Sequence, residues 1–369
     1  MSLAANASSI SVPVSISVSV SVPPVPAMTT TPGTKGSTAG HPPRHVEWQP
    51  HASEFDSETR RLVVRAASDW QAEHHQLEQQ PQQQWSYLNR NVPSRVQHGP
   101  MCGMVALGMG TSYLTSSAST SAHDKAPDSP SLLLAAADPA RPPQVDADSW
   151  RILTLAKQHK YSAYGEMFYA EWLAELASMQ HGSVQAKVLT PLTLSAILQE
   201  LVAGNLVLFP YDADRNHTPC LRSGHKAHWA ILTGFAGVQV SPTAASPDQT
   251  SHDVKDEPIC ADELLKGCTI RVLDNQLHFV SSNADSAQLV MEAESVHFFL
   301  RQGKSRHQAL YPAAAMLKSN WNMVEPDPDR ASFANGLASA DVASYVVPAN
   351  LETLRDRVVV LRAVARSES

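Results

Sequence analysis

A cysteine at the entrance to a long apolar run is the feature that most constrains this chain. Cys102 follows the loop Gln97-His-Gly-Pro-Met and leads into an apolar run from Met104 to Met109. This pattern predicts a buried helix that begins at Cys102 and ends near Tyr113. A thiol at a helix N-terminus lies beside unpaired N–H groups and the positive end of the helix dipole, and both favour the thiolate. The sequence therefore predicts that Cys102 is a nucleophile.

Gln97 and His228 could supply the other groups that a thiolate needs to attack a carbonyl. The side-chain amide of Gln97, on the loop before the predicted helix, can donate a hydrogen bond to a developing oxyanion. His228 begins the predicted strand His228-Trp-Ala-Ile-Leu-Thr-Gly-Phe235 and could accept the thiol proton. One histidine before an apolar strand is more often structural, so the catalytic interpretation rests on its combination with Gln97 and Cys102. The set resembles the site of papain-like cysteine peptidases.

Composition limits the classes of protein to which the chain can belong. The 369 residues carry a formal net charge of −7 and no long basic run, which argues against a general nucleic-acid binder. No run of about 18 apolar residues occurs, so we expect no membrane-spanning helix. The four cysteines are few and irregularly spaced, which favours a reducing compartment, the cytoplasm, over a disulfide scaffold.

The chain divides by composition into three parts. Residues 1–50 form a Ser/Val/Pro-rich tail that we expect to be disordered. Residues 51–84 predict an amphipathic helix, with Ser53 as its N-cap, and a Gln-rich link. Residues 85–365 predict one domain with disordered insertions near 115–147 and 240–262. In that domain we expect helices at 150–159, 165–179, 192–202 and 309–319, and strands at 205–210, 228–235, 268–273, 296–301, 344–348 and 358–361. Helices precede most strands, which is typical of an α+β fold.

Three segments of the chain resemble the actin maturation protease family. They are Gln97 to Ala106, the block from Pro210 to Ala230 that ends in Gly-His-Lys-Ala-His-Trp-Ala, and Arg301-Gln-Gly-Lys-Ser305. The likeness runs from about residue 85 to about 362 and omits the two insertions. It implies a papain-like fold in which a helical N-terminal part, with the nucleophile helix, packs on a C-terminal antiparallel sheet.

The same resemblance implies an activity and a set of roles. The family removes the N-terminal, acetylated Met or Cys from actin, so the expected activity is that of a cysteine aminopeptidase without a cofactor. Cys102 would be the nucleophile and His228 the base. The family tends to carry a proline-rich tail proposed to meet profilin, and here a profilin partnership rests only on Val22-Pro-Pro-Val-Pro26.

The residue that orients the imidazole has two candidates. Asp274, in Leu273-Asp-Asn-Gln276, is acidic and follows a predicted strand, but it comes after an unrecognised insertion. Gln302 ends another predicted strand inside a recognised block, which slightly favours it. Either side chain could fix the tautomer of His228.

Cationic residues near the predicted site could bind the substrate. Lys226 and Lys304 lie in the two recognised blocks around His228 and Gln302, and Arg306 directly follows the second block. Because actin N-termini are acidic just past the removed residue, these side chains could hold the carboxylates. A solvated loop without such a role is the plainer interpretation for any single one of them.

A structural metal site is the main alternative. His217, Cys220, His225 and His228 offer four nitrogen or sulfur ligands within a short segment, a spacing that zinc could use. The chain would then be a zinc-stabilised binding module with Cys102 as a core thiol. Two further alternatives keep the fold: transpeptidation or deamidation by the same thiol, and a non-catalytic actin-binding scaffold.

Overall fold

A computed structural model describes most of the chain from residue 50 onward. The described residues are 50–74, 83–119, 141–142, 144–180, 182–240, 257–282, 286–328 and 346–364. The predicted N-terminal tail and most of both predicted insertions lie outside them. Within the described residues, no helix is long and apolar enough to cross a membrane.

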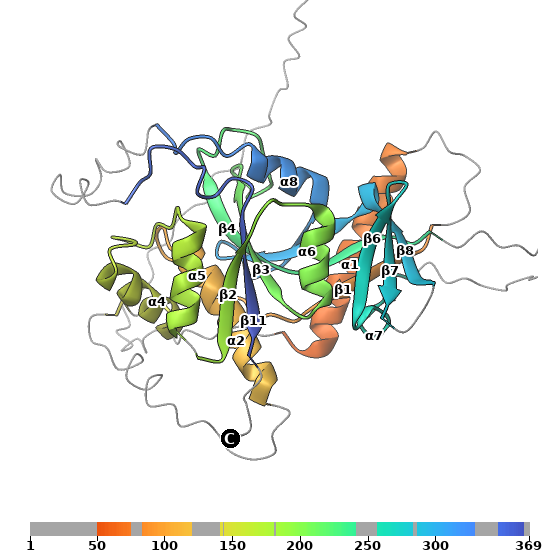
Figure 1. The fold of residues 1–369 in the computed structure, drawn as a ribbon, viewed down its shortest axis with the longest axis horizontal. Coiled ribbons are helices and arrows are strands. Elements are labelled where there is room, and N and C mark those ends of the chain that lie inside the picture. Colours follow the sequence, from red (N-terminus) through yellow and green to blue (C-terminus); the bar gives the residue numbers. More distant parts are fainter. Residues whose placement is uncertain are drawn as a thin grey trace, which may run out of the picture. The chain divides into compact units, whose positions relative to one another are not determined.

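The largest element is an eight-stranded sheet in which nearly all strand pairs are antiparallel (Figure 1). The strands run in the order β10-β9-β4-β3-β11-β2, and β1 pairs with β4 and with the short β5. β4 is the longest, because it pairs with β3 along its first half and with β1 along its second. The strands are β1 (Trp85–Asn89), β2 (Val184–Leu189), β3 (Leu206–Asp212), β4 (Ala227–Val238), β5 (Ile259–Cys260), β9 (His297–Gln302), β10 (Ala309–Pro312) and β11 (Val358–Ala363).

Helices pack against this sheet and complete its core. Gly110 of α2 lies so close to Ile231 and Leu361 that a Cβ there would approach their side chains to 3.0 and 2.6 Å. α4 and α5 pack beside α2, while α6 and α8 contact β3. The α-helices are α1 (Ala52–Glu73), α2 (Cys102–Ser119), α4 (Ala147–Gln158), α5 (Ala170–Gln180), α6 (Leu194–Val202), α7 (Asp262–Leu265) and α8 (Ala313–Trp321). The α+β prediction is confirmed, with the helix that begins at Cys102 packed on the sheet.

A second, three-stranded antiparallel sheet lies beside α6 and the far end of β4. It consists of β6 (Cys268–Leu273), β7 (Gln276–Ser281) and β8 (Ala287–Glu292), and a 3-10 turn, η1 (Ala293–Ser295), leads from it to β9. A bridge between Gln239 and Met291 connects it to the end of β4. The sequence analysis found β6 but not β7 and β8.

Several predicted boundaries were wrong, for local reasons. α2 continues past Tyr113 to Ser119, because hydroxyl groups such as those of Thr111 and Thr115 bond to carbonyls of the preceding turn and so do not break the helix. Residues 115–119 of the predicted insertion are therefore helical. Ser53 is not the N-cap of α1, since the helix begins at Ala52 after His51.

Other corrections concern single turns of chain. α5 begins at Ala170 rather than Gly165, whose φ of +116° is not helical. The predicted helix at 309–319 begins as strand β10 and becomes α8 only at Ala313. Of the predicted strand at 344–348, residues 346–348 form no strand, and the rest lies outside the described part. Residues 257–262 of the second predicted insertion are ordered, and they include β5 and the start of α7.

Candidate active site

Cys102 is the first residue of α2, and the residue after it brings this helix end against β4. A Cβ on Gly103 would lie 3.1 Å from Cβ of Met167 and 3.2 Å from Cδ1 of Trp229. The Trp229 indole is itself held by a 2.8 Å hydrogen bond from its Nε1 to the carbonyl of Met167. A glycine after the cysteine thus allows the helix to begin close to the strand that starts with Ala227 and His228.

His228 lies in a buried aromatic cluster at the start of β4. It pairs across the sheet with Tyr211 of β3, whose ring stands edge-on with centroids 5.9 Å apart. The His217 ring lies 5.5 Å from the His228 ring. Burial raises the pKa of Tyr211, and nearby groups that include the Cys102 thiol raise it further. Cys102 therefore lies near the same cluster.

The electrostatic environment keeps His228 neutral. Burial, with smaller contributions from His217 and Lys304, lowers the pKa of His228 to about 3, and a contact with the side chain of Gln302 opposes the shift. Nε2 of His228 is buried and has no hydrogen-bond partner in the described part of the chain. A neutral imidazole with an unoccupied nitrogen can accept a proton.

Gln97 is held beside the same end of the sheet. Its backbone N–H donates to the carbonyl of Gly303 at 2.6 Å, and its Nε2 donates to the carbonyl of Gly99 at 2.8 Å. An amide NH₂ group has two donors, so one remains for another acceptor. Two residues upstream, the buried Arg95 binds Asp146 and Asp148 at 2.8 Å each and fixes the segment that carries Gln97.

The two candidates for the orienting residue lie in different parts of the fold. Gln302 ends β9, pairs with Ala230 two residues beyond His228, and is buried. Asp274 lies in the exposed turn between β6 and β7, beside the far end of β4. β4 rises about 3.3 Å per residue, so roughly 30 Å of strand separates that end from His228. The structure therefore brings Gln302, but not Asp274, to the candidate site.

Asp212 is a residue near the site that the sequence analysis missed. Its carboxylate is fully buried and accepts hydrogen bonds from the backbone N–H groups of Arg222, Gly224 and Lys226. These bonds shape the loop between β3 and β4, which carries His217. An acidic residue at the end of an otherwise apolar strand was the available signal in the sequence.

The predicted substrate-binding cations lie on the surface around this cluster. Lys226 and Lys304 are exposed, and both lower the pKa of His217 after burial itself, which puts them near that ring. Arg306 is exposed on the turn after β9, where its carbonyl accepts from Nη1 of Arg301 at 2.9 Å. Lys226 and Lys304 are available to a ligand that approaches His217, and Arg306 lies two residues beyond Lys304.

The four residues of the predicted zinc site do not converge. His225 faces Glu325 at 3.3 Å, while Cys220 lies against Asp212, which together with burial raises the pKa of the thiol to about 11. No three His, Cys, Asp or Glu side chains of the described residues are arranged to hold a metal ion.

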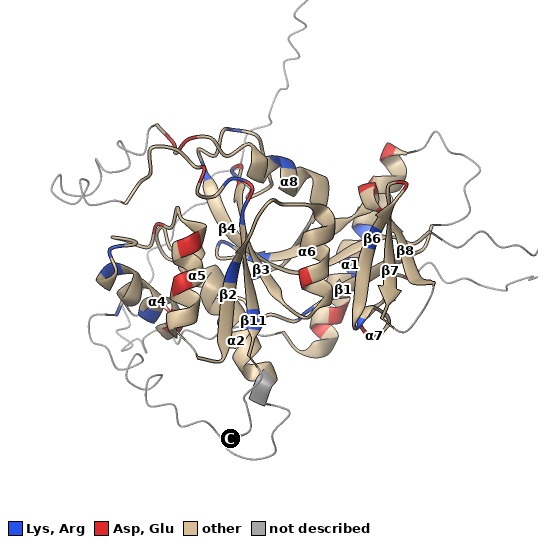
Figure 2. Cartoon of the chain, viewed as in Figure 1, with Lys and Arg blue, Asp and Glu red and all other residues tan. Residues whose placement is uncertain are grey.

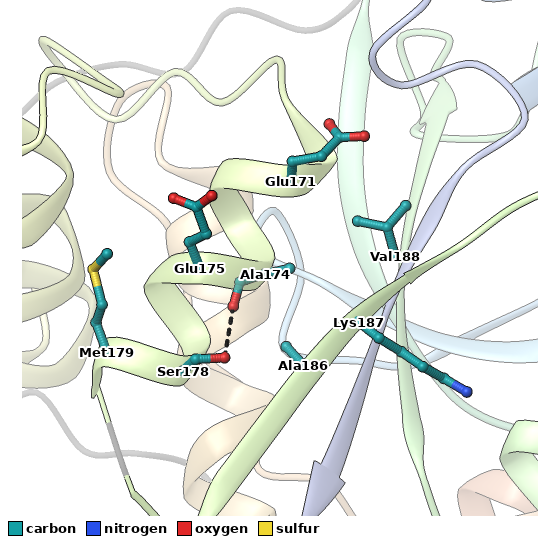
Figure 3. Close-up of a pocket in the computed structure, with 8 residues that line it drawn as sticks. All are labelled: Glu171, Ala174, Glu175, Ser178, Met179, Ala186, Lys187 and Val188. Atoms are coloured by element: carbon teal, nitrogen blue, oxygen red, sulfur yellow. Dashed lines mark hydrogen bonds between the residues drawn. The ribbon is translucent and has the colours of Figure 1, made fainter.

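A surface pocket of about 450 Å³ lies between α5 and the edge strand β2, away from the candidate site (Figure 3). Acidic residues are coloured red on α5 in Figure 2, and Glu171 and Glu175 of this helix line the pocket (Figure 3). The opposite wall includes Lys187, whose Nζ lies 2.7 Å from Glu200 rather than over the pocket. None of the predicted catalytic residues lines this pocket.

Comparison with known proteins identifies relatives of the chain. A model of the actin maturation protease-like C-terminal domain matches residues 131–236, which include His228 but not Cys102. Proteins named actin maturation protease from Mus musculus and Danio rerio are each 30% identical to this chain over 72% of the chain's length. The protein of that name from Xenopus tropicalis is 29% identical over the same share of the chain.

The matched region spans 60% of the mouse protein, 68% of the frog protein and 70% of the zebrafish protein. No solved structure gives a significant match. On the evidence of these relatives, the chain belongs to the actin maturation protease family.

Proposed function

We propose that this chain is a cysteine aminopeptidase that removes the N-terminal, acetylated Met or Cys from actin. The proposal is supported by three contacts: the Cys102 thiol lies near Tyr211, the Tyr211 ring stands edge-on to His228, and Gln97 bonds to Gly303, the residue after Gln302. Relatives named actin maturation protease support actin as the substrate. A thiol nucleophile works in a reducing compartment, and the cytoplasm fits that need.

In the proposed mechanism, the thiol and the imidazole act as a pair. His228 accepts the proton of Cys102 at Nε2, and Sγ attacks the carbonyl carbon of the N-terminal residue. Because the pKa of His228 is about 3 without substrate, the ring does not hold this proton at rest, and proton transfer coincides with attack. The oxyanion accepts hydrogen bonds from Gln97 Nε2 and from the backbone N–H of Cys102.

The tetrahedral intermediate then breaks down, and the two products leave one after the other. The C–N bond breaks, and His228 returns its proton to the departing amine, which is the new N-terminus of actin. The removed residue stays on Cys102 as a thioester. Water, deprotonated by His228, attacks this acyl-enzyme and releases the acetylated amino acid together with the thiol. No step requires a metal or cofactor.

Two further groups have supporting roles in the proposal. Gln302 contacts His228 and orients its ring without supplying a charge. Lys226, Lys304 and Arg306 bind the acidic residues that follow the scissile bond. Both roles require that the reaction takes place where β4 begins and β9 ends.

Mass spectrometry of an actin N-terminal peptide tests the proposal. Peptides that begin with acetyl-Met or acetyl-Cys and continue with acidic residues are incubated with the wild type, Cys102→Ala and Cys268→Ala. Cys268 is a buried cysteine of the small sheet and serves as the matched control. Loss of one acetylated residue with the wild type and Cys268→Ala, but not with Cys102→Ala, is expected. Equal cleavage by Cys102→Ala, or none by the wild type, would contradict the proposal.

A further inference from the structure

The turn after β9 touches Gln97 at a residue that has no side chain. Gly303 follows Gln302, and a Cβ built on it would lie 2.8 Å from both Cβ and Oε1 of Gln97 and 3.1 Å from its Cγ. Carbon atoms essentially never approach one another to 2.8 Å without displacement of one of them. Since the contact includes Cβ of Gln97 and not only the end of its side chain, a new rotamer alone would not relieve it.

The requirement for glycine at this position is steric and not conformational. Gly303 is not among the glycines with a positive φ, so its backbone suits any residue. What excludes a side chain is the closeness of the two segments, which their 2.6 Å hydrogen bond also holds together. The absence of a Cβ at residue 303 therefore serves the contact with Gln97.

The contact determines where the Gln97 amide lies. Its Oε1 is buried against Gly303 and has no hydrogen-bond partner among the described residues, while Nε2 donates to Gly99. The turn is itself held by a hydrogen bond from Nη1 of the fully buried Arg301 to the carbonyl of Arg306. Gln97 is thus placed by a fixed surface on one side and by a hydrogen bond on the other.

We propose that Gly303 is a positioning residue, which fixes the Gln97 amide where it can donate to the oxyanion. This inference rests on the proposed function, because an oxyanion forms only if the chain carries out acyl transfer. Gly303 acts through Gln97 and does not touch the substrate itself. The same turn carries Gln302, so one short segment supports both the oxyanion donor and the base.

A double-mutant cycle tests the inference with the acetylated peptide. Removal of one oxyanion donor costs roughly 10²–10³ in kcat, so Gln97→Gly should lose about that much. Gly303→Ala should lose roughly 10-fold or more in kcat with little change in KM, because it displaces the same donor. In the Gln97→Gly background, which lacks both the amide and the Cβ that the new methyl group would meet, Gly303→Ala should cost less than about threefold further.

The control is Gly182→Ala, where an added Cβ meets nothing and the residue is exposed; it should retain wild-type kcat. If the wild type cleaves and Gly303→Ala cleaves equally fast, or the two losses multiply, the positioning role is overturned while the proposed function stands. If the wild type does not cleave at all, the proposed function falls and the positioning role falls with it.

Thermal unfolding covers the case in which Gly303→Ala does not fold. Gln97→Gly removes the Cβ that the new methyl group would meet. Recovery of a folded protein in Gln97→Gly/Gly303→Ala would identify this contact as the cause. A double variant that stays unfolded would show that the methyl group clashes elsewhere, and the inference would be wrong.

Discussion

The two sheets of this protein differ in how firmly they hold the side chains that their strands carry. In the main sheet, β3 and β9 are buried along their whole length and β4 along nearly all of it. In the small sheet, most residues of β6 are at least partly exposed. A buried strand has one register, because a slip by one residue would move every side chain to the opposite face, away from the neighbours against which it packs. Groups that must be aimed to within a fraction of an ångström therefore belong on the main sheet, where His228 and Gln302 lie.

The largest expected effect is the loss of the base on the main sheet. We predict that His228→Ala lowers kcat for the acetylated actin peptide by roughly 10³-fold or more, because no other group then takes the thiol proton. Steady-state kinetics measure this, and a thermal unfolding curve checks that the variant is folded. A variant with more than a tenth of wild-type kcat would show that His228 is structural.

A smaller effect is expected at Gln302, which orients the base without reacting. Gln302→Leu should lower kcat roughly 10–100-fold and leave KM nearly unchanged, as expected for a residue that supports a reacting group. Gln302→Asn keeps the amide on a shorter side chain and should lose less. Wild-type kcat in Gln302→Leu would leave His228 without an orienting residue from β9.

The buried His228 also makes stability depend on pH. Its pKa of about 3 in the folded protein lies below the ordinary value of about 6.5, so below pH 6.5 the unfolded chain takes up a proton that the folded ring refuses. Stability is therefore full above about pH 6.5 and falls as pH falls towards 3, by up to about 1.4 kcal/mol per pH unit from this group. Urea unfolding at pH 5 and pH 7 should show a smaller difference for His228→Asn than for the wild type. Equal differences would mean that the ring is protonated in the folded protein.

Charge reversal at the rim of the site should change substrate binding by a modest factor. Lys304→Glu/Arg306→Glu should raise KM for an acidic N-terminal peptide by about 3–10-fold, since exposed ion pairs contribute about 0.2–1 kcal/mol each. KM for a matched peptide with Asn and Gln in place of the acidic residues should stay unchanged. An equal increase in KM for both peptides would show that these cations do not bind the acidic residues.

The smallest effect is expected on the small sheet. Asp274→Asn should change kcat by less than about twofold, because the side chain lies in an exposed turn far from His228 and surface substitutions have little effect. Kinetics under the same conditions as for Gln302→Leu provide the comparison. If Asp274→Asn lowered kcat as much as Gln302→Leu does, the two sheets would not differ in their importance for catalysis.

Residues near the site were predictable from the sequence where local pattern and buried strands agree. Cys102 begins a helix as predicted, and His228 is the second residue of a strand, one residue from the predicted start, because the apolar runs that follow them specify buried elements. The site's details depend on contacts between distant segments. The turn at Gly303 lies against Gln97, and Asp212 holds the backbone of three loop residues. Neither contact could be predicted, because neither has a strong local signal in the sequence.

Strands β7 and β8 of the small sheet were missed because their signals are short. Leu273-Asp-Asn-Gln276 is a two-residue hairpin turn in which both Asp274 and Asn275 have a positive φ, as the tightest hairpins require. Asp-Asn between apolar segments was therefore evidence for a turn, and against a catalytic acid. The interpretation of Asp274 as a possible orienting residue gave more weight to its charge than to its neighbours.

Cysteine alkylation tests whether Cys102 and His228 act as a pair. The wild type and His228→Ala are treated with iodoacetamide at pH 7, and the modified cysteines are mapped over time by peptide mass spectrometry. Burial raises the pKa of Cys220, to about 11, and that of Cys268, so both should react slowly. We predict that Cys102 reacts faster than Cys220 and Cys268 in the wild type and markedly more slowly in His228→Ala, with the exposed Cys260 as a reference thiol whose rate is the same in both proteins. Modification of Cys220 or Cys268 before Cys102 would contradict this prediction. An equal rate at Cys102 in the wild type and in His228→Ala would also contradict it.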